Sequence, residues 1–199
     1  MNGRHHVITN VSTVITIDTG LKILSRASDN DIYSKCHNFV LSQSNIEQEL
    51  QLSSIAVNIG MTVICIVLFV IGSLLPDIDQ ENSTLGKIIY IPVQHRTWTH
   101  TFWIIAFLAV LSVSVSCLMW LCLGYLLHLF YDSLSKGGIC WFYPLSQYKT
   151  WTSGAQIKKN HKIYLYRTGE TSELIITMLA AFVGASMLAY NIYLTVGPS

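Results

Sequence analysis

Long apolar blocks, separated by polar connections, dominate the pattern of this 199-residue chain. Residues 54–75 form one block, which stops at Pro76, and residues 173–196 form the last one. Residues 50–76 and 101–127 contain no charged side chain. Because an uncharged apolar stretch of more than about 18 residues is long enough to cross a bilayer, these blocks predict membrane-spanning helices.

The first apolar block is less decisive. Residues 6–24 alternate Val, Ile and Thr and contain Gly20, so both a helix and a strand remain open there. The polar residues 27–51 predict an insertion that lies outside the membrane. The length of the chain suggests a single domain, residues 1–199.

Composition and charge agree with a membrane protein. Hydrophobic residues make up 51% of the chain and charged residues 12%, which is about half the usual charged share. A formal net charge of +1 gives no field that would attract nucleic acid. The five cysteines contain no CxxC pair, so we interpret them as small buried apolar residues rather than as a disulfide framework.

Ionisable residues beside the apolar blocks are the candidate chemistry, because such groups are costly in a membrane and mark functional sites. His128 and Asp132 are four residues apart, so on a helix they share one face. An imidazole nitrogen and a carboxylate oxygen together suit a transition metal. The alternative is a hydrogen bond between these two side chains inside a helical bundle.

Two further motifs lie at the ends of the polar connection 77–100. Asp77 and Asp79 point the same way if the backbone between them is extended, and two negative charges so close need a cation or a proton. The alternative is a solvated loop, since Asp is common at turns. His95 and His100 would lie about 140° apart around a helix, so both can bind one metal only if His95 precedes the helix.

Arg96, which follows His95, is a natural clamp for a phosphate or a carboxylate. The alternative for this motif is an interfacial cluster of snorkelling polar residues. His6, next to His5 near the start of the chain, is a weaker candidate ligand. Taken together, His and Asp residues at the margins of apolar blocks predict a site for a divalent metal.

The order of these residues resembles the YdjM family of membrane-bound, metal-dependent hydrolases. The resemblance covers nearly the whole chain apart from residues 27–51. The resembling residues are His6; Leu75, Pro76, Asp77, Ile78, Asp79 and Ser83; His95 to His100; Gly124 to His128 with Asp132; Gly138; Tyr143, Pro144 and Leu145; and Thr168, Gly169 and Glu173.

This family is similar, at a distance, to zinc-dependent phospholipase C and related single-strand nucleases. The resemblance therefore implies an all-α fold: a multi-pass membrane helical bundle with a phospholipase C-like helical core and a metal site at the helix ends. It implies one or two divalent ions, with zinc as the expected metal and Asp132 as the bridging residue. The implied ligands are Asp77 or Asp79, His100 or His95, and His128 on one ion, and His6 on the other.

The function implied by the resemblance is hydrolysis of a phosphoester, lipid-like or nucleotide-like, by a metal-activated water. One of Asp77 and Asp79 would bind the metal while the other accepts the proton of the water, and Arg96 would hold the substrate phosphate. The alternative is a non-catalytic metal-binding membrane protein, either a carrier or a regulatory protein. Site residues at the ends of the apolar blocks slightly favour a surface site over a transport pathway.

If His100 and His128 bind the same metal cluster, the chain must turn within residues 101–132. As one straight helix this block would be about 48 Å long, and His100 and His128 would lie about 42 Å apart. That length also exceeds the roughly 30 Å hydrocarbon core of a bilayer. We therefore predict a reversal at residues 112–116, whose serines can hydrogen-bond the backbone groups freed at two helix ends. The two short helices would dip into the membrane or cross it obliquely.

Positive charge lies mainly in the connections beside the predicted site. These cations are Lys87, Arg96, Lys136, Lys149, Lys158, Lys159, Lys162 and Arg167. The opposite side has Lys35, with Lys22 and Arg26 near the end of a helix. By the positive-inside rule, the site is predicted to face the cytoplasm from a bacterial-type inner membrane.

Overall fold

The computed structural model describes residues 3–28, 55–145 and 165–196. Within these ranges the chain is helical and forms no β-strand, which confirms the predicted all-α fold. The α-helices are α1 (Gly3–Ser28), α4 (Ile55–Leu74), α5 (Phe102–Ser114), α6 (Leu118–Leu134) and α7 (Thr171–Val196). Two short 3-10 helices, η1 (Leu75–Asp79) and η2 (Trp98–His100), lie between α4 and α5.

Three helical segments are long and apolar enough to cross a membrane: Gly3–Leu24, Thr62–Asp79 and Thr171–Tyr193. The first of them shows that residues 6–24, where a strand was also possible, are helical. Because α1 continues to Ser28, it includes the first two residues of the insertion predicted at 27–51. The rest of that insertion lies outside the described residues.

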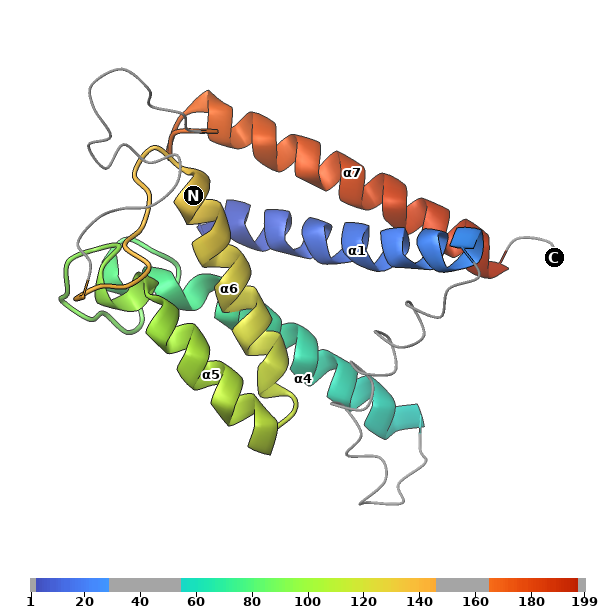
Figure 1. Ribbon diagram of the computed structural model, residues 1–199, viewed down its shortest axis with the longest axis horizontal. Helices are drawn as coiled ribbons and strands as arrows, with labels where there is room; N and C mark the ends of the chain where they lie inside the picture. The colour runs from blue at the N-terminus through green and yellow to red at the C-terminus, as the bar shows by residue number, and fades with distance from the viewer. Residues whose placement is uncertain (1–2, 29–54, 146–164, 197–199) are drawn as a thin grey trace.

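The predicted reversal is present between α5 and α6 (Figure 1). These two helices are about 20 Å and 25 Å long at 1.5 Å per residue, so each is shorter than the hydrocarbon core. The chain turns at residues 115–117, where the Val115 N–H donates to the Leu111 carbonyl oxygen. Ser112 donates to Ala109 inside α5, so backbone bonds rather than serine side chains close the turn.

Figure 1 shows two groups of helices that meet at one end and diverge from there. α1 lies along α7, while α4 packs against α6, with α5 beside α6. Glycines make the contact between α4 and α6 close. A Cβ on Gly72 would lie 2.1 Å from the Leu121 carbonyl oxygen, and a Cβ on Gly124 would lie 2.3 Å from the Phe69 carbonyl oxygen. Such small-residue contacts allow apolar helices to associate in a membrane.

The end of α4 determines the backbone on which Asp77 and Asp79 lie. Pro76 lies at the start of η1, where its fixed φ suits the first turn of a helix and its missing N–H costs nothing. Asp77 and Asp79 therefore lie on 3-10 backbone, so the condition under which they would point the same way, an extended backbone, is not met. The two carboxylates approach different atoms of His100: Asp77 Oδ1 lies 3.9 Å from its Nε2, and Asp79 Oδ2 lies 3.6 Å from its Nδ1.

The connection between α4 and α5 and the described residues 135–145 and 165–170 between α6 and α7 lie at the end of the molecule where α1 begins (Figure 1). A small buried core lies beside them, formed by Ile105, Tyr125, Leu129 and Ile139. Asn10 of α1 donates to Ser73 Oγ at 3.0 Å and to the Gly124 carbonyl oxygen at 3.3 Å. The two helix groups are thus joined by polar contacts at this end.

Candidate metal centre

Five buried ionisable side chains from four helical elements converge at this end of the molecule. They are His6 of α1, Asp77 of η1, His100 of η2, and His128 and Asp132 of α6. Each of them is at most 3% exposed. Ionisable groups buried this densely need a compensating partner, because an unpaired buried charge is very costly.

Two overlapping sets of side chains have the spacing of metal ligands. The first set is Asp77, His95, His100 and Asp132, and the second is His6, Asp77 and His128. Within each set the candidate ligand atoms lie within 4.8 Å of one another. Asp77 is common to both sets, whereas the resemblance implied that Asp132 bridges. His128 falls with His6, and their rings stack at a centroid distance of 3.7 Å.

Imidazole nitrogens without hydrogen bonds face the two carboxylates. The Nε2 atoms of His6, His100 and His128 are buried and make no hydrogen bond. His6 Nε2 and His100 Nε2 lie 3.2 Å and 3.5 Å from the carboxylate oxygens of Asp132. His128 Nε2 lies 3.6 Å from Asp77 Oδ1. Imidazole nitrogens and carboxylate oxygens directed at a common space are a usual donor set for zinc, so the residues present fit a divalent cation.

Contacts behind two of the rings fix which nitrogen faces the centre. His128 Nδ1 donates to the Ser73 carbonyl oxygen at 2.7 Å, which leaves Nε2 with its lone pair. His100 Nδ1 lies 2.9 Å from Thr99 Oγ1 and 3.6 Å from Asp79 Oδ2, so its Nε2 likewise faces inward. Contacts of this kind set the tautomer and the ring direction of metal-binding histidines.

Asp79 orients its neighbours with both carboxylate oxygens. Oδ1 lies 2.8 Å from His95 Nδ1. Oδ2 accepts hydrogen bonds from Thr99 Oγ1 at 2.5 Å and from the Arg96 backbone N–H at 3.2 Å. Asp79 belongs to neither candidate ligand set. Its contacts therefore suit a residue that positions His95 and His100.

His95 lies in the connection before η2, which is the position that lets it and His100 face one centre. Its side chain is 32% exposed, so it is the most accessible of the candidate ligands. Gln80 Nε2 lies 2.7 Å from His95 Nε2 and 3.1 Å from Asp77 Oδ1. The centre is therefore closed on this side only by partly exposed side chains.

Arg96, the predicted phosphate clamp, lies beside the centre. Its guanidinium is 3.1 Å from Asp132 Oδ1 and donates to Ser135 Oγ at 2.9 Å. The side chain passes over Gly137, where a Cβ would lie 1.8 Å from Nη1 of Arg96. The guanidinium charge offsets the buried charge of Asp132, and the role of Arg96 as a phosphate clamp stays a prediction.

The surroundings of His100 also bear on metal binding. Burial alone would lower the pKa of His100, but contacts with Asp132 and Asp79 outweigh burial and raise that pKa above 6.5. A histidine ligates a metal through its neutral form. A proton and a divalent cation therefore compete for His100.

One buried contact beside the centre was not predicted. His5 Nδ1 lies 2.5 Å from Glu173 Oε1, and Glu173 is 1% exposed. Glu173 Oε2 accepts a hydrogen bond from the Gly169 N–H at 2.7 Å. This pair joins the start of α1 to the start of α7. The two residues are 168 positions apart, and the only signal for Glu173 was its place in the family resemblance.

The family of this chain follows from its similarity to known proteins. A sequence model of the YdjM inner membrane protein family matches residues 47–196, which is most of the chain. The chain belongs to this family. The segment that matches the YdjM model contains Asp77, His95, His100, His128 and Asp132, while His6 precedes it. No curated protein and no solved structure matches the chain.

Membership of the YdjM family confirms the resemblance seen in the sequence. Together with three helices of spanning length, it makes this chain a membrane protein. The buried His and Asp cluster could hold a metal ion. The similarity to phospholipase C, the identity of the metal and the hydrolytic activity stay predictions.

Proposed function

We propose that this YdjM-family protein is a membrane-bound, metal-dependent hydrolase of phosphoesters, with zinc as its metal. The observation that carries the proposal is the set of three buried Nε2 atoms, on His6, His100 and His128, that make no hydrogen bond and face two buried carboxylates. Buried imidazole nitrogens that make no hydrogen bond cost free energy unless a cation binds between them and the carboxylates.

His6, Asp77 and His128 would hold one ion, and Asp77, His100 and Asp132 would hold a second. A divalent ion there supplies Lewis acidity and an activated water. In phosphoester hydrolysis the oxygen of water bonds to phosphorus, the ester P–O bond breaks, and the leaving alkoxide takes up a proton.

We assign proton acceptance to His95 rather than to Asp79. Both carboxylate oxygens of Asp79 are already engaged, and one of them lies 2.8 Å from His95 Nδ1. With its Nδ1 proton directed at Asp79, His95 Nε2 accepts from the Gln80 amide at 2.7 Å, and a water that replaces this amide would give its proton to Nε2 on the accessible side of the centre. Histidine with an orienting carboxylate is a common general base. Arg96 then contributes positive charge beside Asp132, where a phosphate would be stabilised.

The test combines elemental analysis of detergent-purified protein with assays on phosphomonoester and phosphodiester substrates. We expect one or two zinc ions per chain, and we expect Asp132→Asn to remove most of the metal and all turnover. Asp18→Asn is the matched control, because Asp18 is a partly exposed residue of α1 paired with Lys22 away from the centre. Protein prepared without chelator that holds no stoichiometric metal would refute the proposal.

The non-catalytic alternative gives a different result in the same experiment. A carrier or regulatory protein would bind the metal, lose it in Asp132→Asn, and cleave none of the substrates. The accessible His95 and Gln80 argue against a purely structural metal site, which is closed on all sides, and turnover distinguishes the hydrolase from a carrier.

A further inference from the structure

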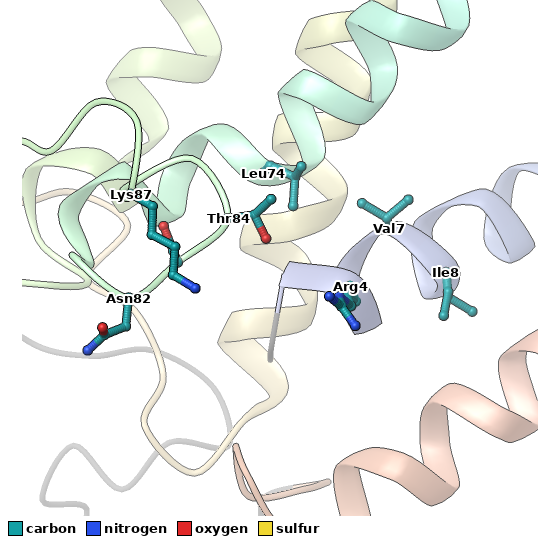
Figure 2. Close-up of a pocket in the computed structure, with 8 residues that line it drawn as sticks. Arg4, Val7, Ile8, Leu74, Asn82, Thr84 and Lys87 are labelled. Atoms are coloured by element: carbon teal, nitrogen blue, oxygen red, sulfur yellow. The ribbon is translucent and has the colours of Figure 1, made fainter.

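A cavity beside the metal centre combines positive charge with an apolar wall. It lies between the start of α1 and the loop after η1 and has a volume of about 680 Å³. Figure 2 shows Arg4 of α1 and Lys87 of the loop on opposite sides of it, with Thr84 between them. Two cations and a hydroxyl around one space suit the oxygens of a phosphate.

The apolar wall of this cavity continues into the membrane-spanning part of the molecule. Val7 and Ile8 of α1 and Leu74 of α4 line the first cavity. A second cavity of about 310 Å³ is lined further along the same two helices, by Val14 of α1 and Val70 of α4 among others. Both cavities are thus lined by α1 and α4, with Trp120 of α6 also lining the second, and we treat them as one groove that is polar at one end and apolar at the other.

The spacing of the lining residues supports a single groove. On α1 they recur every three or four residues, which places them on one face of the helix: Arg4, Val7, Ile8, Val11, Val14 and Ile15. From Arg4 to Ile15 the helix rises about 16 Å at 1.5 Å per residue. One leaflet is half of a hydrocarbon core of roughly 30 Å, so the groove is about as long as one leaflet is thick.

The cations at the polar end differ from several other basic residues in the described ranges. Arg96 pairs with Asp132, Arg167 with Glu170 and Lys22 with Asp18. Neither Arg4 nor Lys87 forms an ion pair with any residue in the described parts of the chain. Within the described residues no carboxylate neutralises these two charges, which suits an anionic ligand.

The loop that carries Lys87 is apolar immediately afterwards. Ile88, Ile89 and Ile91 are 77%, 62% and 42% exposed. Exposed isoleucines beside a lysine suit the interface of a membrane, where the apolar side chains enter lipid and the charge stays at headgroup level. The polar end of the groove thus lies where lipid headgroups lie.

We propose that the groove between α1 and α4 binds one phospholipid-type molecule, with its phosphate between Arg4 and Lys87 and an acyl chain along the two helices. The phosphate would lie next to the metal centre, because Ser83 of the cavity donates to the Asp77 carbonyl oxygen and Val7 follows His6. For the proposed hydrolase this names the substrate class, a lipid phosphoester, and that part of the inference rests on the proposed function.

Binding is tested on full-length protein in neutral detergent after removal of metal with a chelator. Native mass spectrometry would follow titration with phosphatidic acid, with diacylglycerol, and with inorganic phosphate. We expect phosphatidic acid to bind one to one. We expect diacylglycerol, which lacks the phosphate, and inorganic phosphate, which lacks the acyl chains, to bind at least roughly tenfold more weakly.

Matched variants locate the site. Arg4→Gln and Lys87→Gln should each weaken phosphatidic acid binding about fivefold, the effect of one cation near an anionic headgroup. Arg167→Gln, which removes the same charge from an exposed pair outside the groove, should leave binding unchanged. Val14→Phe should fill the apolar end and weaken binding, whereas Val183→Phe, on the exposed side of α7, should not.

Three results would overturn the inference: equal binding of diacylglycerol, equal binding of inorganic phosphate, or equal losses in the groove variants and their controls. None of them bears on the proposed hydrolysis, because the assay contains no metal and measures no turnover. Conversely, a protein that binds phosphatidic acid in the groove and cleaves no phosphoester would remove the proposed function and leave the lipid site standing.

Discussion

His5 and His6 are adjacent, yet they have opposite surroundings. His6 is fully buried and faces Asp132, while His5 is part-exposed and contacts Glu173 of α7. Adjacent residues of an α-helix point about 100° apart, so only one of the two can face a given centre. The sequence predicts a histidine near the start of the chain as a ligand, but the choice between the neighbours depends on how α1 is rotated against α6 and α7.

At the scale of single residues, His100 gives a pH-dependent prediction. Contacts with Asp132 and Asp79 outweigh the effect of burial and raise the pKa of His100 above 6.5, so the metal-free protein releases the proton of His100 at a higher pH than a free histidine would. Since zinc must displace this proton, apparent zinc affinity should increase with pH and continue to increase above pH 6.5. Competition with a chromophoric chelator between about pH 6 and pH 8.5 measures this, because neutral imidazole is the ligating form.

The variant Asp79→Asn tests whether the Asp79 carboxylate raises the pKa of His100. Removing one of the carboxylates that raise the pKa of His100 should move the steep part of the curve to lower pH. Asp18→Asn should leave the curve unchanged. Zinc affinity that does not change with pH in the unsubstituted protein would contradict this prediction.

At the scale of helices, the apolar blocks predicted the elements better than the local motifs did. The blocks at 54–75 and 173–196 correspond to α4 and α7. The reversal that was predicted from helix length is present between α5 and α6. The backbone at Asp77 and Asp79 stayed open in the sequence, because the spacing of two carboxylates does not distinguish a strand from a 3-10 turn after Pro76.

The pattern of apolar positions in the sequence did not predict how the helices pack against one another. Gly72 and Gly124 are ordinary members of apolar runs in the sequence, but in the structure they allow the backbones of α4 and α6 to touch. Likewise, the groove depends on the rotation of α1 relative to α4. The spacing of apolar residues along one helix shows which face is apolar, but it does not show which face of another helix that face contacts.

The glycine contact gives a stability prediction. Gly72→Ala and Gly124→Ala should each destabilise the protein, by about 1–3 kcal/mol as for other overpacked sites, because the added methyl meets a carbonyl oxygen. The thermal unfolding midpoint in detergent measures the effect. Gly60→Ala is a control in α4 itself, since a Cβ on Gly60 meets nothing within 4 Å. Equal midpoints for Gly60→Ala and Gly72→Ala would show that α4 and α6 do not pack this closely.

At the scale of the whole molecule, the positions of charges on the described chain give an orientation. Arg4, Lys87, Lys136 and Arg167 lie at the end with the metal centre, and Lys22 lies toward the other end of α1. Because basic residues are retained on the cytoplasmic side, we predict that the centre faces the cytoplasm.

Thiol labelling in intact cells checks this orientation. Lys87→Cys should react with a membrane-impermeant reagent only after the cells are opened, and Tyr193→Cys, at the far end of α7, should react in intact cells. The unsubstituted chain, which has five cysteines of its own, gives the background. The reverse pattern would place the centre outside the cytoplasm.

The distribution of the candidate ligands along the chain also sets an order of events during biosynthesis. His6 leaves the ribosome first, and Asp132 follows 126 residues later. At roughly 5–20 residues per second, this interval is about 6–25 s, during which α1 is present without most of its partners. Neither ligand set can be complete before Asp77 and α6 have been made and inserted. Loading with metal would therefore be a late step in the maturation of this protein, and a chain stopped before α6 could not be loaded.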